Sequence, residues 1–215
     1  MTRSRLATAA LAGLLCAAAT APANAKLAFP PLCTVPAVVV GCPSGAALPS
    51  CGTANGGTTQ TVPGFRLVLR DFTNAPMANV TVLLDFSATP VRLLGDERPG
   101  TIVNCAARVI QRVTDAQGVV VFAPRFCGGT EEARVRITAD GVWVREIPAR
   151  STDLDGNGET GLSDFARVAR NFLDGTHDAA TDFDSCSGEP GITTLADFAV
   201  FASELLRAPA GVACP

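Results

Sequence analysis

The sequence predicts a mainly β sandwich followed by a small C-terminal α domain built from two loop-helix units. Between residues 65 and 150, apolar and polar residues alternate in short runs, as in strands with one face in a core. In residues 151–215, apolar residues instead recur at helical spacing. The chain has 215 residues and is 47% hydrophobic, so it can bury a core, but it is too short for a catalytic barrel of roughly 250 residues.

The first 25 residues have the pattern of an export signal. Arg3 and Arg5 precede an apolar stretch over residues 6–19, and small residues at 23–25 form a cleavage site. A transmembrane anchor fits less well, because the apolar stretch is shorter than the roughly 20 residues that a span needs. We therefore expect a secreted protein, extracellular or at the cell surface, that begins at Lys26 and has no membrane span.

Cysteine usage predicts structural disulfides. The chain from residue 26 onward keeps seven cysteines, which is typical of an oxidising compartment. Two of them lie in the tail, and we predict that Cys186 pairs with Cys214. Because seven is odd, one thiol stays free or pairs between molecules. The sequence leaves open the pairing of the other five: Cys33, Cys42, Cys51, Cys105 and Cys127.

Acidic residues concentrate at the C-terminal end. Residues 151–215 carry three Arg against eleven Asp and Glu, a net charge of −8, whereas residues 26–150 carry twelve basic against nine acidic residues, or +3. Such a tail repels nucleic acid and anionic membranes and attracts cations or basic partners. We expect no nucleic-acid partner.

The pattern in the middle of the chain predicts strands joined by tight turns. Apolar residues alternate along Phe65–Leu69 and along Val80–Phe86, and Asp140-Gly141 predicts a hairpin turn. This order, with a further turn at residues 115–118, resembles bacterial immunoglobulin-like domains. The resemblance implies a Greek-key sandwich over residues 65–150 that serves as a spacer or adhesive module. Residues 26–64 form a Cys- and Pro-rich segment leading into it, with one strand at 37–40 and otherwise a disulfide-pinned loop.

Residues 153–164 have the pattern of a twelve-residue calcium loop. Oxygen-bearing side chains fall at positions 1, 3, 5 and 12, and a glycine at position 6 permits the sharp turn. Calcium prefers six to eight oxygen ligands, so alternate side chains that converge in a tight loop suit it. We predict a calcium site held by Asp153, Asp155, Asn157, the backbone carbonyl of Glu159, and Asp164.

Each of two loops leads into an amphipathic helix. Phe165, Val168, Ala169 and Phe172 share one face of the first helix, and Gly175 marks its end. Asp164-Phe165-Ala166 recurs as Asp197-Phe198-Ala199, at an offset of 33. The matching face of the second helix consists of Phe198, Phe201, Ala202 and Leu205. One such unit cannot bury its apolar face alone, so the two should pack face to face.

Two calcium loop-helix units, each without an entering helix, resemble the dockerin-type (F-hand) repeats of secreted bacterial proteins. The resemblance runs from Asp153 to Leu206 within a predicted domain of residues 151–215. It implies that Asp153, Asp155, Asn157 and Asp164 are ligands of site one. It implies a cohesin-like module as partner and a place in extracellular assemblies, often of polysaccharide degradation. The chain departs from the family at residues 162–163 and 195–196, where Leu-Ser and Leu-Ala replace small polar residues that contact cohesin.

The second loop is four residues longer than the first and places Cys186 at position 5. A thiol is a poor calcium ligand. Either Asp182, Asp184 and Asp197 still converge on a second calcium, or the loop is metal-free and held by Cys186–Cys214. Both alternatives remain open at this point.

Three functions compete. The first is a non-catalytic, secreted, calcium-stabilised modular protein whose tail docks or caps, with an adhesive or spacer domain. The second is a small enzyme or accessory subunit of extracellular polysaccharide degradation, for which Asp71 and Asp85 qualify only by residue type. The third is a disulfide-linked subunit of a surface filament or envelope, which self-associates through the odd cysteine.

Overall fold

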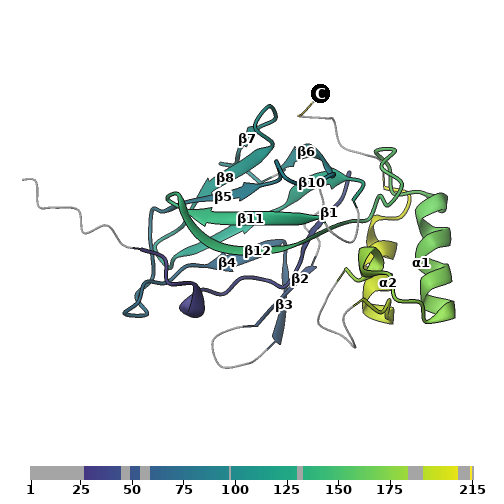
Figure 1. The fold of residues 1–215 in the computed structure, drawn as a ribbon, viewed down its shortest axis with the longest axis horizontal. Helices are drawn as coiled ribbons and strands as arrows, with labels where there is room; N and C mark the ends of the chain where they lie inside the picture. The colour runs from purple at the N-terminus through teal and green to yellow at the C-terminus, as the bar shows by residue number, and fades with distance from the viewer. Residues whose placement is uncertain are drawn as a thin grey trace, which may run out of the picture.

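The computed structural model describes residues 27–44, 49–53, 59–96, 98–129, 133–183, 191–207 and 214. This part of the chain is mainly β, with two short α-helices at its C-terminal end (Figure 1). The predicted mainly β class with a small helical tail is therefore confirmed. The export signal predicted at residues 1–25 lies outside the described residues.

The largest sheet has six strands. In spatial order they are β1 (Val39–Gly41), β12 (Val142–Ser151), β11 (Arg134–Ala139), β5 (Thr81–Asp85), β8 (Val109–Val113) and β7 (Ile102–Asn104). All neighbours are antiparallel except β1, which runs parallel to β12. Three two-stranded ladders accompany the sheet: β4 (Phe65–Val68) with β9 (Val119–Phe122), β6 (Arg92–Asp96) with β10 (Pro124–Cys127), and β2 (Pro49–Thr53) with β3 (Thr59–Pro63).

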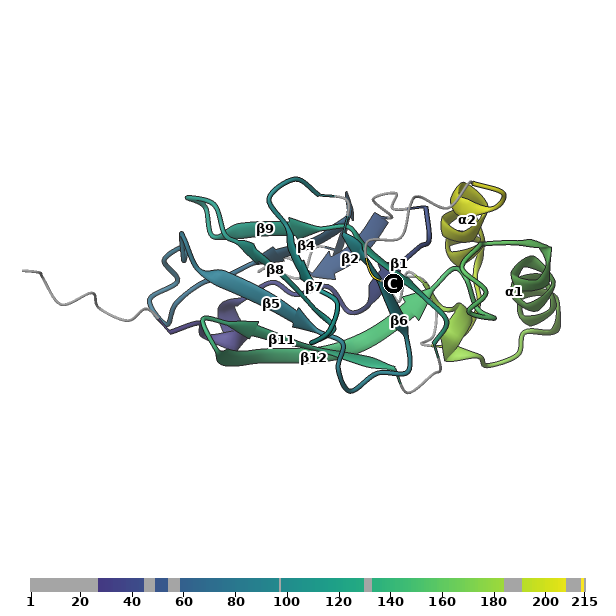
Figure 2. The same ribbon diagram turned by 90° about the horizontal axis from the view of Figure 1, so that it is seen from above.

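Alternate residues of the large sheet and of two ladders share one apolar core. Its fully buried side chains include Leu67, Leu84, Phe86, Ile110, Phe122, Phe126 and Ile137. The rings of Phe86 and Phe126 lie 5.3 Å apart, joining the chain after β5 to β10. In Figure 2, β4 and β9 lie on one side of this core, and β11 and β12 lie on the other. The period-two pattern of the sequence arises from this burial.

Both predicted tight turns are present. Asp140 and Gly141 have φ values of 46° and 80°, which is the geometry of a two-residue hairpin turn between β11 and β12. In the other turn, Asp115 Oδ1 accepts hydrogen bonds from the backbone N–H groups of Gln117 (2.9 Å) and Val119 (2.8 Å). Gly118 there has a φ of +73°, and a Cβ would lie 2.5 Å from the Leu69 carbonyl oxygen, so only glycine fits.

The segment before residue 65 departs from expectation. The strand predicted at 37–40 is present as β1, shifted to Val39–Gly41. The predicted loop is wrong at residues 49–53 and 59–63, since these form the β2–β3 ladder. The side chain of Cys51 lies outside the described part, so its pairing stays a prediction. Cys33 is a free cysteine whose sulfur accepts a hydrogen bond from the Arg70 N–H (3.4 Å). Backbone pairing, including the Thr34–Val68 bridge, holds this segment on the β domain.

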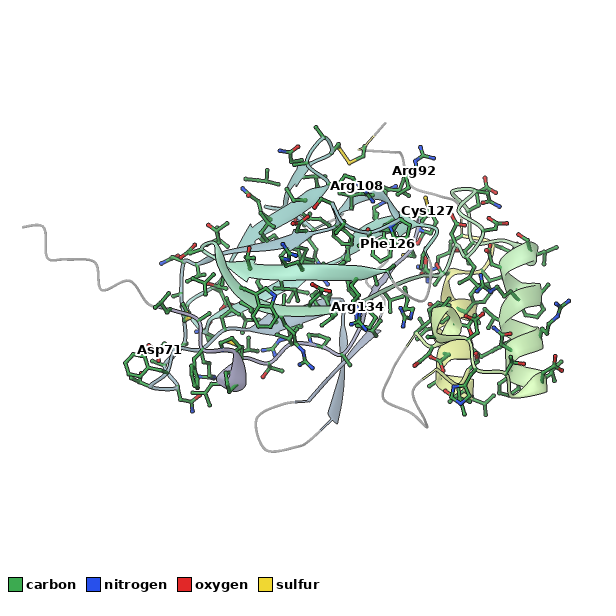
Figure 3. The ribbon with its side chains drawn as sticks, in the orientation of Figure 1. Asp71, Arg92, Arg108, Phe126, Cys127 and Arg134 are labelled. Atoms are coloured by element: carbon green, nitrogen blue, oxygen red, sulfur yellow. A yellow bond between two sulfur atoms is a disulfide. The ribbon has the colours of Figure 1, made fainter. Side chains whose placement is uncertain are left out.

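The C-terminal end of the chain returns to the sheet. Cys214 is bonded to Cys105, just after β7, with a Cα–Cα distance of 5.2 Å. The predicted Cys186–Cys214 pair is therefore wrong, and Cys186 lies outside the described residues. The physical reason is burial: Cys214 is 4% exposed within the β core, and its N–H donates to the Leu94 carbonyl (3.2 Å). The bond is the yellow link near the top of Figure 3.

The tail contains α1 (Leu162–Asp174) and α2 (Leu195–Glu204). As predicted, α1 ends at Gly175, whose φ of 59° is left-handed, and the rings of Phe165 and Phe198 lie 5.8 Å apart across the two helices. One expectation fails: Ala202 is exposed, and Val200 is buried instead.

Strand β1 explains this difference. Val38 and Val40 join the tail's own core, whereas Val39 faces the β core. Strand β1 thus contributes to both cores, and Val40 shares the tail core with Val200 and Phe201 of α2.

Candidate metal centre

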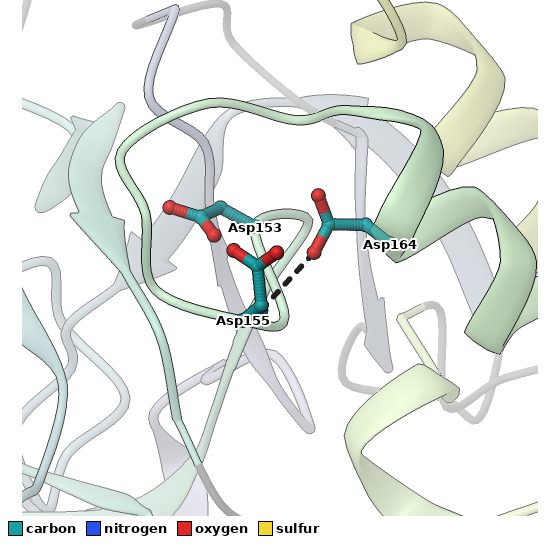
Figure 4. Close-up of side chains that lie close together, drawn as sticks. All are labelled: Asp153, Asp155 and Asp164. Atoms are coloured by element: carbon teal, nitrogen blue, oxygen red, sulfur yellow. Dashed lines mark hydrogen bonds between the residues drawn. The ribbon is translucent and has the colours of Figure 1, made fainter.

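Three carboxylates meet where the sheet ends and α1 begins. Asp153 and Asp155 follow β12 directly, and Asp164 lies in the first turn of α1. One oxygen from each lies within 4.8 Å of the others (Figure 4). The structure therefore brings together three of the five residues predicted for site one.

Asp153 is fully buried and organises the loop backbone. Its Oδ1 accepts a hydrogen bond from the Gly156 N–H, and its Oδ2 accepts one from the Gly158 N–H, both at 2.7 Å. Both glycines have positive φ, 78° and 100°, which other residues rarely adopt. The glycines let the loop wrap around the first carboxylate.

Asp164 closes the loop from its far end. Its Oδ1 accepts hydrogen bonds from the N–H groups of Leu154 (2.7 Å) and Asp155 (3.1 Å), the second of which is dashed in Figure 4. Its Oδ2 accepts the N–H of Gly161, the residue that caps α1, at 2.8 Å. One buried carboxylate thus fixes the first positions of the loop and the start of the helix.

Asp155 is exposed and held by its neighbours. Ser163 donates its hydroxyl to Asp155 Oδ2 (2.7 Å), and Asn157 donates from Nδ2 to the same oxygen (3.1 Å). The Ser163 hydroxyl is the main cause that lowers the pKa of Asp155. Sequence reasoning missed this role of Ser163. Asn157 and Glu159 are exposed beside the cluster, and their role as ligands stays a prediction.

The cluster has no counter-charge within the described residues. No Lys or Arg there forms an ion pair with Asp153, Asp155 or Asp164. Burial raises the pKa of Asp153 from 3.8 to about 6, and the negative charge of Asp164 acts in the same direction. The N–H groups of Gly158 and Gly156 oppose this rise. Three converging carboxylates with oxygen donors only suit a hard divalent cation such as calcium, whereas zinc prefers nitrogen and sulfur.

The second loop repeats part of this arrangement. Asp197 Oδ2 accepts hydrogen bonds from the Thr194 N–H and hydroxyl, both at 2.8 Å, and the first of these matches the bond from the Gly161 N–H to Asp164. Asp182 Oδ2 accepts the Gly191 N–H at 2.8 Å. Both aspartates are buried. Asp184 lies outside the described residues, so a second calcium remains a prediction.

A pair of threonine hydroxyls supports each loop. Thr152 and Thr160 approach to 2.8 Å in the first loop, and Thr181 and Thr193 approach to 2.6 Å in the second. Each pair places one threonine directly before the first aspartate and the other four residues before the last. The matching positions of these threonines are part of the sequence repeat, but their hydroxyl pairing was not predicted.

The first loop is attached to the β core at several points. The Gly128 N–H donates to the Asp153 carbonyl (2.9 Å), and the Thr152 N–H donates to the Gly41 carbonyl (3.2 Å). The Ser151 hydroxyl donates to the Phe126 carbonyl at 3.0 Å. The Cys127 thiol lies close by, and its pKa is raised first by burial and then by the charge of Asp153. Any ion at the loop is therefore coupled to β10 and β12.

The carboxylates considered for catalysis have other contacts. Asp71 Oδ1 accepts hydrogen bonds from the Thr73 N–H (2.9 Å), the Thr73 hydroxyl (2.6 Å) and the Ala75 N–H (3.0 Å), so it stabilises a turn. Asp71 lies at the end of the molecule away from the helices (Figure 3). Asp85 lies on β5 and accepts the Ser87 N–H at 2.8 Å.

Comparison with known proteins finds no matching family model, no matching curated protein and no matching solved structure. Among the described residues, no helix is long and apolar enough to cross a membrane. The function therefore has to be argued from the site itself.

Proposed function

We propose that the chain is a non-catalytic exported modular protein whose C-terminal loop-helix pair binds calcium, in the manner of dockerin-type repeats. The observation that carries the proposal is the convergence of Asp153, Asp155 and Asp164, with which no Lys or Arg of the described residues forms an ion pair. In the same proposal the β part is an immunoglobulin-like spacer or adhesive module, supported by its alternating strands and single core.

Calcium in this proposal is structural. Without an ion, the three converging carboxylates repel one another. Calcium neutralises their charge, so its binding stabilises the loop and the start of α1. The loop is already closed by N–H donors to Asp153 and Asp164, which reduces the ordering needed on binding. An extracellular site needs a dissociation constant of only roughly 10⁻⁴–10⁻³ M.

The helix pair offers a docking surface for a protein module. An apolar groove of about 270 Å³ lies between α1 and α2, lined by Ala169, Phe172, Leu173, Leu195 and Phe198. Leu162 and Leu195 occupy equivalent positions in the two units, and both are largely exposed. This pair of leucines supports docking through apolar contact, in place of the small polar residues that cohesin-binding relatives use.

The proposal is tested by melting the full exported chain in calcium and in EDTA. We expect calcium to raise the melting temperature of the wild type clearly more than that of the double variant Asp153→Asn/Asp164→Asn, which disables the first loop alone. Asp174→Asn, which removes an exposed carboxylate from α1, is the matched control and should respond like the wild type. An equal response of wild type and double variant, or none in either, contradicts the proposal.

A further inference from the structure

A polar groove of about 150 Å³ lies on the solvent face of the six-stranded sheet and shares no lining residue with the metal centre. It is lined by Asp85, Ser87, Ala88, Arg134, Arg136 and Glu146. Arg134 lies at the end of β11 nearest the helices (Figure 3). The groove thus draws charged side chains from three adjacent strands, β5, β11 and β12.

The sheet register places opposite charges side by side in this groove. Arg136 is the direct cross-strand partner of both Asp85 on β5 and Glu146 on β12. Opposite charges in such positions commonly attract and pair. Among the described residues, however, no ion pair joins Asp85 or Glu146 to Arg134 or Arg136. The charges line an open space, where they remain available to a ligand.

The charges and hydrogen-bonding groups of the lining indicate which class of ligand the groove suits. Two carboxylates and two guanidinium groups give no net charge, so neither a polyanion nor a polycation is favoured. Carboxylates only accept hydrogen bonds, and guanidinium groups only donate them. A hydroxyl group does both, so a ring of neighbouring hydroxyls satisfies both kinds of side chain at once.

An exposed tryptophan lies on the same face of the sheet, outside the residues that line the groove. Trp143 is 56% exposed and pairs across strands with Thr138, two residues along β11 from Arg136. Residues two apart on a strand share a face, as do cross-strand partners. A flat apolar ring beside hydrogen-bonding charges suits a ligand with one C–H face and a hydroxylated edge. A cavity of about 150 Å³ holds one six-membered ring.

We propose that this groove binds one unit of a neutral saccharide. The carboxylates of Asp85 and Glu146 accept from sugar hydroxyls, and Arg134 and Arg136 donate to sugar oxygens. Trp143, which lies outside the lining on the same face, packs against an adjoining part of the saccharide. A site that contacts a single ring has an expected dissociation constant on the order of 10⁻⁴–10⁻³ M. The proposal does not depend on calcium binding by the tail.

The chain itself supplies the probe. It has one tryptophan and no tyrosine, so its tryptophan fluorescence reports on Trp143 alone. The full exported chain is titrated with neutral gluco-, xylo-, manno- and chito-oligosaccharides. Oligogalacturonate, trilysine and triglutamate serve as charged contrasts. We expect a saturable change in emission with at least one neutral saccharide and none with the charged probes.

Two variants and two matched controls complete the test. Arg136→Gln and Glu146→Gln should each weaken saccharide binding about tenfold or more, because each removes a charged hydrogen-bonding group. Arg170→Gln and Asp174→Asn, which change exposed charges on α1, should bind like the wild type. Thermal melts verify that every variant is folded. Absence of a saturable change with all neutral saccharides, binding of the charged probes only, or equal affinity of variants and controls overturns the proposal.

Discussion

The backbone N–H of Leu154 donates a hydrogen bond to Oδ1 of Asp164 over 2.7 Å. This bond joins the second residue of the loop to its last residue. Asp164 also accepts two further backbone N–H groups and is buried. The same carboxylate is therefore both a proposed ligand and the structural closure of the loop.

Because of this double role, we expect substitution of Asp164 to affect stability more than substitution of Asp155. We expect Asp164→Ala to destabilise the chain by about 2–4 kcal/mol even in EDTA, because three backbone donors lose their acceptor. Asp155→Ala should cost less than about 1 kcal/mol in EDTA, because Asp155 is exposed, yet should still weaken calcium binding. Urea unfolding in EDTA measures both values. Equal free energies of unfolding for the two variants would count against this assignment.

The metal-free chain should depend on pH through Asp153. Its pKa is about 6 in the folded state against an ordinary value of 3.8, so the folded state holds this proton more tightly. Stability in EDTA should therefore fall as pH rises from about 4 to about 6, by up to about 3 kcal/mol, and stay low above that range. Urea unfolding at several pH values, with Asp153→Asn as the comparison, measures this. If the two pH profiles coincide, Asp153 is not the cause.

The Thr152–Thr160 hydroxyl pair should behave cooperatively. Thr152→Val leaves the buried Thr160 hydroxyl unsatisfied and should cost about 1–3 kcal/mol. The double change to valine removes both polar groups and should cost clearly less than the sum of the single changes. A double-mutant cycle by urea unfolding measures the coupling. Strict additivity would show that the two hydroxyls act independently.

The Cys105–Cys214 disulfide should stabilise the β core. It links residues 109 apart in sequence, and loss of such a bond typically costs about 2–4 kcal/mol. Cys105→Ala, Cys214→Ala and the double variant should therefore have closely similar stabilities, and reductant should lower the wild type toward them. Melting curves with and without reductant test this. Peptide mapping under non-reducing conditions that finds Cys214 linked to another cysteine would refute it.

Local patterns predicted the parts of the fold that local physics determines. The loop spacing of Asp153, Asp155 and Asp164, the end of α1 at Gly175 and the Asp140-Gly141 turn each depend on residues within one turn or loop. The partner of Cys214 and the parallel pairing of β1 with β12 depend on residues more than 100 positions away. No periodicity encodes such contacts, so neither could be derived from the sequence.

The groove proposed to bind a saccharide likewise depends on contacts that no local sequence pattern predicts. Asp85 was a candidate by residue type alone, because the sequence does not show that Arg136 and Glu146 lie beside it. Only the register of three strands brings these residues together. Likewise, Ala202 belongs to the predicted apolar face of α2 but is exposed, whereas Val200 is buried in a core that also contains Val40 of β1.

Titration calorimetry of the chain from residue 26 onward, after EDTA treatment, tests most directly whether residues 153–164 bind calcium. We expect at least one calcium ion per chain, with a dissociation constant no weaker than roughly 10⁻³ M. Two ions would assign the second to the loop of Asp182 and Asp197, and a single ion would leave that loop without a metal. Absence of calcium binding at millimolar concentrations would contradict the account of this site.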